Sequence, residues 1–201
     1  MASSGAAESE PQWAERVSRR LLAPLGMRWR HTVGVAERAR MVGEAMDPDE
    51  AELLLAAAYV HDVGYAPELA KTGFHPVDGA RFVRGSGHER LSGLVAYHSG
   101  AAAESIERGL EGELAEFVDE RSIVSRALTY CDLTTDSDGL PAEPVERLAE
   151  IRERYGQGAP EAKALERSEA ALLDDVRVVE TMLANSGQGS ARRSPRLGGR
   201  E

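Results

Sequence analysis

Histidine and aspartate residues in this chain lie beside apolar stretches, at positions that continue the apolar face of a helix. In "AAAYVHDVGY" a run of small apolar residues leads directly into the adjacent pair His61-Asp62. On a helix, His61 lies on the same face as Ala57 and Ala58, four and three residues earlier, so its ring points along an apolar surface. The chain has five histidines in 201 residues. A single histidine on an apolar face is more often a hydrogen-bonded core residue than a ligand, so a chemical role depends on further polar groups placed in the same way.

Three further segments place polar groups in the same way. His98 follows Leu94 at helical spacing, Asp132 follows Leu128, and His31 begins an apolar stripe of its own. A buried carboxylate without a partner is costly, and several buried imidazoles would leave many polar groups to satisfy in one core. A divalent cation satisfies them directly, because imidazole and carboxylate are its usual ligands. The pattern predicts a metal site.

Helices must position these groups, because apolar residues recur at helical spacing through nearly the whole chain. Asp47 is a helix cap, Pro48 suits the first helical position, and Glu50 completes a capping-box pattern. We expect Gly64 to end that helix in a left-handed turn. No segment alternates with period two for long enough to predict a strand. The sequence predicts an all-α domain with helices at 13–22, 31–46, 48–62, 76–84, 88–98, 102–118, 120–134, 143–155 and 160–185.

Composition excludes several classes of function. The formal net charge of −10 argues against a nucleic-acid partner, which would need a concentrated basic surface. The longest apolar run, residues 53–60, is too short to span a bilayer, so no membrane partner is expected. The N-terminus has no secretory signal, and a single cysteine, Cys131, suits a reducing compartment. These features predict a cytoplasmic protein.

The polar residues also resemble a known signature. His31 in "HTVGVAERA", His61-Asp62 in "AAYVHDVGY" and Asp132 in "LTYCDLT" are similar to the H…HD…D signature of the HD-domain superfamily of metal-dependent phosphohydrolases. The resemblance covers roughly residues 31–134. It implies a helical bundle in which these four residues hold a divalent metal ion. We expect an HD domain over 12–140. Outside the resemblance, further helices over 141–186 are expected to pack on it, as a cap over the site or as a dimer face. Composition predicts disordered tails at 1–11 and 187–201, the second of them basic.

Two further matches imply a second metal ion. "HPVDGARF" resembles the H-x-x-x-G-A segment, and "VAYHSG" the later histidine, of subfamilies that hold two metals. The resemblance implies that His75 and His98 hold the second ion, with Asp62 bridging the two and so acting as the catalytic carboxylate. The expected cofactors are two divalent ions per chain, drawn from iron, manganese, cobalt or magnesium.

The implied activity is hydrolysis of a phosphate ester or anhydride in a nucleotide-like small molecule. Lys71, between the HD pair and the next histidine, and Arg81, on the helix after it, are the residues expected to bind the substrate phosphate. Tyr65 stands where cyclic-dinucleotide phosphodiesterases of the HD-GYP type have lysine, which disfavours that activity. The alternatives are a di-iron oxygenase that cleaves a C–P or C–C bond and a non-catalytic scaffold. The identity of the metal would separate the two enzymes.

Overall fold

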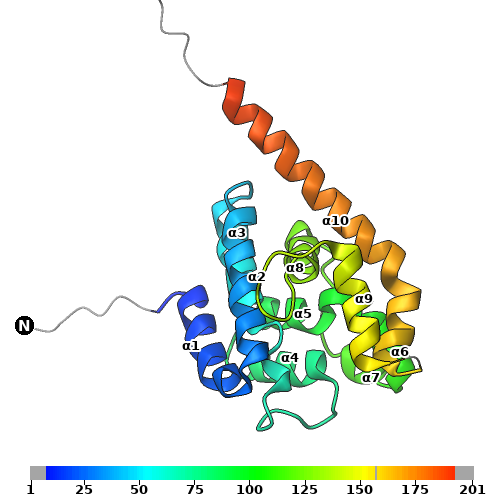
Figure 1. Ribbon diagram of the computed structural model, residues 1–201. Helices are drawn as coiled ribbons and strands as arrows, with labels where there is room; N and C mark the ends of the chain where they lie inside the picture. The colour runs from blue at the N-terminus through cyan, green and yellow to red at the C-terminus, as the bar shows by residue number, and fades with distance from the viewer. Residues whose placement is uncertain (1–7, 157, 193–201) are drawn as a thin grey trace, which may run out of the picture.

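The structure, a computed structural model, describes residues 8–156 and 158–192. Within these ranges it is built of helices, with one isolated antiparallel bridge between Thr135 and Pro141 and no strand, so the predicted all-α class is confirmed (Figure 1). Short 3-10 turns are η1 (Ala23–Leu25), η2 (Val63–Tyr65) and η3 (His98–Gly100). The α-helices are α1 (Glu10–Leu22), α2 (Met27–Gly43), α3 (Pro48–Val60), α4 (His75–Gly85), α5 (Glu89–Tyr97), α6 (Ala101–Arg108), α7 (Glu111–Leu114), α8 (Ile123–Leu133), α9 (Pro144–Tyr155) and α10 (Pro160–Arg192).

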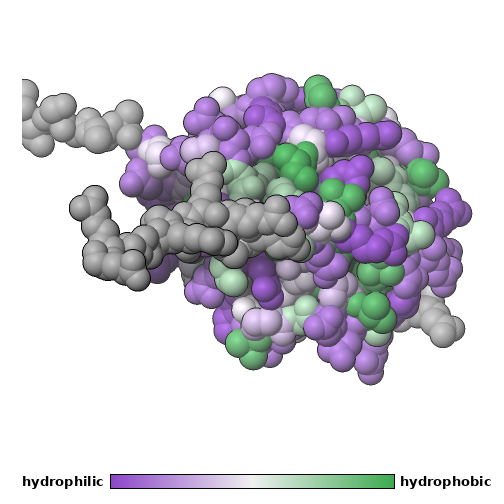
Figure 2. Space-filling model, turned by 90° about the horizontal axis from the view of Figure 1, so that it is seen from above, coloured by the Kyte–Doolittle hydropathy of each residue, from purple (hydrophilic) through white to green (hydrophobic). Residues whose placement is uncertain are grey.

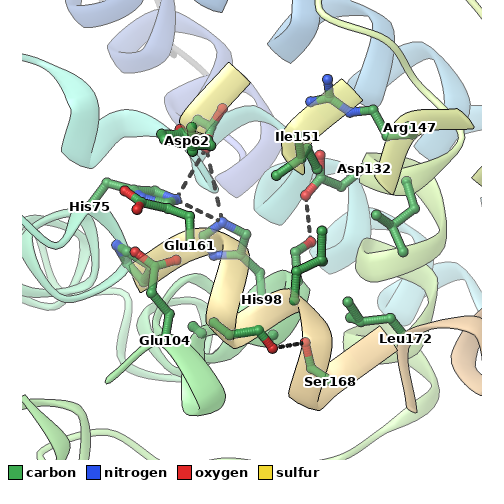
Figure 3. Close-up of a pocket in the computed structure, with 18 of the residues that line it drawn as sticks. Asp62, His75, His98, Glu104, Asp132, Arg147, Ile151, Glu161, Ser168 and Leu172 are labelled. Atoms are coloured by element: carbon green, nitrogen blue, oxygen red, sulfur yellow. Dashed lines mark hydrogen bonds and ion pairs between the residues drawn. The ribbon is translucent and has the colours of Figure 1, made fainter. Parts of the chain in front are cut away.

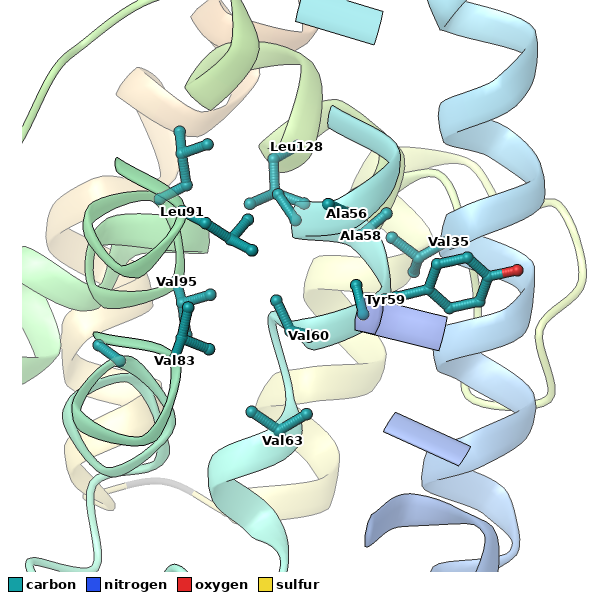
Figure 4. Packing of buried hydrophobic residues seen from close by; sticks show 14 of the residues in the cluster. Val35, Ala56, Ala58, Tyr59, Val60, Val63, Val83, Leu91, Val95 and Leu128 are labelled. Carbon is teal, nitrogen blue, oxygen red and sulfur yellow. The ribbon is translucent and has the colours of Figure 1, made fainter. Parts of the chain in front are cut away.

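The apolar helix α3 lies at the centre of the bundle. It packs against α1, α2, α5 and α8, and its residues from Ala56 to Ala58 are fully buried, as is Val60. Small side chains on α3 let the neighbouring helices approach closely, and larger apolar residues such as Leu91 and Val95 of α5 face Val60 across the core (Figure 4). His61 and Asp62, which follow α3, therefore lie in the interior of the domain.

A second group of helices covers one side of this bundle. The long helix α10 packs against α6, α8 and α9, and its C-terminal end extends beyond the rest of the molecule (Figure 1). A separate apolar cluster joins these helices; it includes Leu133 of α8, Leu148 of α9, and Leu165 and Leu172 of α10. The helices α9 and α10 thus form a layer over the ends of α8 and η3.

Several element boundaries differ from those expected from the sequence. The helix expected over 102–118 is divided into α6 and α7, because Gly109 adopts the left-handed conformation (φ 66°) and ends α6. Helix α2 begins at Met27, four residues before the expected start. In the expected tails, Ser9 caps α1 in a capping box with Gln12, and α10 continues to Arg192. The other residues of those tails, 1–7 and 193–201, lie outside the described residues.

Gly64 has a different role from the one predicted. Asp47 does cap α3, through its carboxylate and the Asp49 N–H, but α3 ends at Val60 and Gly64 has no positive φ. The glycine is required by a close approach instead: a Cβ there would lie 2.0 Å from the carbonyl oxygen of His75. The missing side chain lets η2 cross the start of α4, which brings His75 next to the end of α3.

Hydrophilic residues cover most of the face shown in Figure 2, where apolar residues lie in small separate groups. None of the helices in the described ranges is long and apolar enough to cross a membrane.

Candidate metal centre

The six predicted ligands come from five places in the chain and lie close together in the interior. Figure 3 shows four of them, Asp62, His75, His98 and Asp132. Each of the six stands at or near the end of a buried helix, so that the core of the domain fixes its backbone. His31 lies near the start of α2, His61 and Asp62 follow α3, His75 begins α4, His98 begins η3, and Asp132 is near the end of α8.

Backbone carbonyl groups orient three of the four histidines. In each of the three, Nδ1 lies within hydrogen-bond distance of a carbonyl oxygen, and when Nδ1–H donates to it, Nε2 keeps its lone pair. Metal-binding histidines are commonly oriented in this way. The pairs are His31 with Asp136 (2.9 Å), His61 with Ala58 (2.8 Å) and His98 with Val95 (2.6 Å).

One group of three ligands is formed by His31, His61 and Asp62, whose ligand atoms lie within 4.8 Å of one another. Nε2 of His61 is buried without a hydrogen-bond partner and lies 3.4 Å from Oδ2 of Asp62. Asp132 joins this group through His31, because its Oδ1 is 3.0 Å from Nε2 of that ring. An unpartnered buried nitrogen among carboxylate oxygens is the environment that a divalent cation satisfies, so these residues fit a metal ion.

The second group is formed by Asp62, His75 and His98, again within 4.8 Å. Nε2 of His75 lies 3.2 Å from Nε2 of His98 and 3.5 Å from Oδ1 of Asp62. Asp62 belongs to both groups and has a different oxygen nearest each: Oδ2 lies beside His61 and Oδ1 beside His75. A carboxylate in this position can bridge two cations.

The protonation states of Asp62, Asp132, His75 and His98 favour cation binding. Burial would raise the pKa of Asp62, but Arg28 and His61 hold it well below its usual range; His31 has the same effect on the pKa of Asp132. Burial lowers the pKa values of His75 and His98, which are therefore neutral.

His61 differs from these two histidines. Burial opposes its charged form, but the carboxylates of Asp62 and Asp132 raise its pKa to about 9. The two carboxylates thus favour a positive charge beside this ring.

Arg28 and Tyr65 extend the centre toward solvent. Nη1 of Arg28 donates to Oδ2 of Asp62 at 2.8 Å, and its guanidinium lies over the Tyr65 ring, 3.9 Å from the ring centroid. The other face of Tyr65 stacks on His75, with centroids 3.9 Å apart. Arg28 is not among the residues predicted from the sequence, although its position one helical turn before His31 was a usable signal.

Ser99 holds Asp132 from a strained backbone. Its φ of 45° and ψ of 44° are left-handed, a region that residues other than glycine seldom adopt. From there its hydroxyl donates to Oδ2 of Asp132. Strained residues of this kind concentrate at functional sites, and this one directly follows the predicted ligand His98.

A cavity of about 90 Å³ lies over the centre, between the ligand-bearing helices and the α9–α10 layer. Arg147, Ile151 and Arg154 of α9 line it, at the four- and three-residue steps of one helical face. A second hollow of about 280 Å³ adjoins it. Both hollows are lined by Arg28, His31, Tyr65, Arg147 and Arg154.

Lys71 and Arg81 do not line either hollow, and their expected role in binding the substrate phosphate stays a prediction. The carboxylate of Asp78 accepts the backbone N–H of Lys71 and fixes that loop, and the Lys71 side chain is exposed. Arg81 forms an ion pair with Glu116 at the surface. The cations at the cavity are arginines: Arg28, one helical turn before His31, and Arg147 and Arg154 of α9, which sequence spacing does not relate to the predicted ligands.

The chain belongs to the HD domain family, whose family model matches residues 28–136, more than half of the chain. All six ligand positions lie in that range, and the family is one of metal-dependent phosphohydrolases that bind divalent metals. The helices α9 and α10 lie outside it. No curated protein and no solved structure matches the chain.

Proposed function

We propose that the protein is a phosphohydrolase with two divalent metal ions, which cleaves a phosphate ester or anhydride of a nucleotide-like small molecule. The observation that carries this proposal is the position of Asp62, which belongs to both groups of ligands and has a different oxygen nearest each. His31, His61, Asp62 and Asp132 would hold one ion, and Asp62, His75 and His98 the other. Bound divalent ions lower the pKa of a water ligand and neutralise charge on a phosphoryl group.

The chain itself supplies groups that hold the substrate. Arg28 is kept between Asp62 and the ring of Tyr65, from where its planar guanidinium can donate to phosphoryl oxygens. Burial and the charge of Asp62 raise the pKa of Tyr65 well above its usual value, so its hydroxyl stays protonated. That hydroxyl lies 3.2 Å from the Tyr155 hydroxyl, and this pair can donate hydrogen bonds to the substrate at the mouth of the cavity.

The cavity also has an apolar wall. Apolar side chains of the α9–α10 layer, among them Ile151, Leu165 and Leu172, line it. A phosphoryl group bound at the predicted ligands would have these apolar side chains beside it, which reduces its contact with water.

The proposal is tested by phosphate release from a panel of nucleoside mono-, di- and triphosphates and dinucleoside polyphosphates. The protein is stripped with a chelator and reloaded separately with manganese, cobalt, magnesium or iron. We expect phosphate or nucleotide release that is lost on stripping and regained with at least one metal. Release that none of the metals restores, together with oxygen consumption by the iron-loaded protein, would instead support the oxygenase.

A further inference from the structure

We propose that Arg147 and Arg154 of α9 form a second anion site beside the metal centre, which binds a second phosphoryl group of the substrate. This inference rests on the proposed function. It narrows the substrate class to molecules with two linked phosphoryl groups: one binds at the metal centre, and an anhydride bond joins it to the second. Both arginines line both hollows.

Arg147 is a buried cation whose hydrogen bonds are incomplete. Its side chain is 4% exposed, and Nη1 donates to Oε2 of Glu150 at 2.5 Å. Its Nε is buried without a partner; among the described residues, the only other such side-chain atom is Nε2 of the predicted ligand His61. A buried guanidinium with a free donor is costly unless something fills the site. An anion in the cavity that Arg147 lines would supply the missing acceptor.

Arg154 lies two helical turns beyond Arg147 on the same face of α9. Its guanidinium also donates to Glu150, so one carboxylate holds two arginines in place. Glu150 can neutralise only one of the two positive charges. The pair therefore keeps a net positive charge next to Arg28, and planar guanidinium groups suit phosphoryl oxygens.

The opposite end of the cavity has the reverse charge. Glu104 of α6 and Glu161 of α10 line it there, and both pair with Arg108, at 2.6 and 2.5 Å. Figure 3 shows these two glutamates on the side of His75, whereas Arg147 lies on the side of Asp132. Two carboxylates with one arginine repel an anion. The charge distribution thus directs an anionic chain from the metal centre toward α9.

The test compares variants of α9 on two kinds of substrate. Arg154→Met and Arg147→Met each remove one cation, and Arg152→Met is the matched control, because Arg152 lies on the same helix but pairs with Glu169 and lines neither hollow. The readout is the ratio of kcat/KM for a nucleoside diphosphate to kcat/KM for p-nitrophenyl phosphate, which has a single phosphoryl group.

We expect this ratio to fall about 10- to 100-fold in either variant, as for loss of a hydrogen bond to a charged group, and to stay unchanged in the control. A merely structural role for the arginines would lower both kcat/KM values together and leave the ratio constant, which would overturn the proposal. If Arg147→Met fails to fold, Arg154→Met alone tests the proposal. The Arg154 side chain is 29% exposed, so its replacement is expected to leave the fold intact.

A binding measurement separates this inference from the proposed activity. Methylenediphosphonate and methylphosphonate, which are not hydrolysed, are titrated into the metal-loaded protein by calorimetry. We expect Arg154→Met to weaken the diphosphonate at least about tenfold more than the monophosphonate. Equal effects on both would overturn the second site. The expected binding pattern in a protein that hydrolyses no phosphate compound would support the site and contradict the hydrolase.

Discussion

The two sides of the cavity are built by different means. The ligand side is formed by the ends of buried helices, and three of its histidines are oriented by backbone carbonyls. The α9–α10 side presents arginines and glutamates held by side-chain ion pairs, and it lies outside the matched range 28–136. A backbone that is part of the core cannot shift without disturbing packing, whereas a side chain held by an ion pair can be replaced without moving the backbone.

This difference assigns separate tasks to the two sides. The ligand side needs fixed atoms, because metal binding tolerates little displacement of its donors. In the proposed function the α9–α10 side selects the substrate, because it lines the cavity opposite the predicted ligands. Changes on the ligand side should abolish activity, whereas changes on the other side should alter substrate preference.

The largest effect is expected for Asp62→Asn, which keeps the size of the side chain but removes its charge. Both groups of ligands lose their shared carboxylate, so we expect metal content and phosphate release to fall, activity by more than about 100-fold. Asp138→Asn is the matched control, because Asp138 is a surface residue paired with Arg30. Full activity of Asp62→Asn would contradict a bridging role.

His75→Asn separates the two groups of ligands, since His75 belongs to only one of them. We expect the metal content to fall from about two ions per chain to about one, with activity reduced but the fold retained. Mass spectrometry of metals on the purified variant makes this measurement. An unchanged metal content would show that His75 is not a ligand.

Gly64→Ala tests the close approach of η2 to the start of α4, which positions His75. A Cβ would lie 2.0 Å from the His75 carbonyl oxygen, so the backbone of η2 or α4 must shift. We expect the free energy of unfolding to fall by about 1–3 kcal/mol, the usual cost of overpacking. Gly112→Ala is the control, because a Cβ there has nothing within 4 Å. Equal urea midpoints for the two variants would contradict the close approach.

The smallest effects are expected at the two cations that lie outside the cavity. Lys71→Met and Arg81→Met should change kcat/KM by less than about twofold, as is usual for surface charges. Arg28→Met, which removes a cation inside the cavity, should lower kcat/KM at least about tenfold. A large loss of kcat/KM in Lys71→Met or Arg81→Met would show that these residues do bind the substrate.

The sequence predicted the ligands better than the cations for a physical reason. Apolar periodicity shows which face of a helix is buried, so a histidine or aspartate on that face can be recognised from one segment alone. The structure brings all six predicted ligands together, while their binding of metal stays a prediction. Arg147 and Arg154 meet them only because α9 packs across the end of α8, and no local pattern encodes that contact.

The role of Gly64 could not be predicted from the sequence for the same reason. Its position after an apolar helix is typical of a helix end, and the close approach that requires it involves α4, eleven residues later at His75. Local signals were correct where the cause was local, as for the Asp47 cap of α3. They gave a wrong prediction for Gly64, because a tertiary contact with the start of α4 determines the role of that residue.

The most direct test of the account is the metal content of the wild-type protein purified without chelator, measured by inductively coupled plasma mass spectrometry. The bridging position of Asp62 predicts about two divalent ions per chain, lost on chelation and regained on reconstitution. One ion or fewer after reconstitution with manganese, cobalt, iron and magnesium in turn would contradict the two-metal centre.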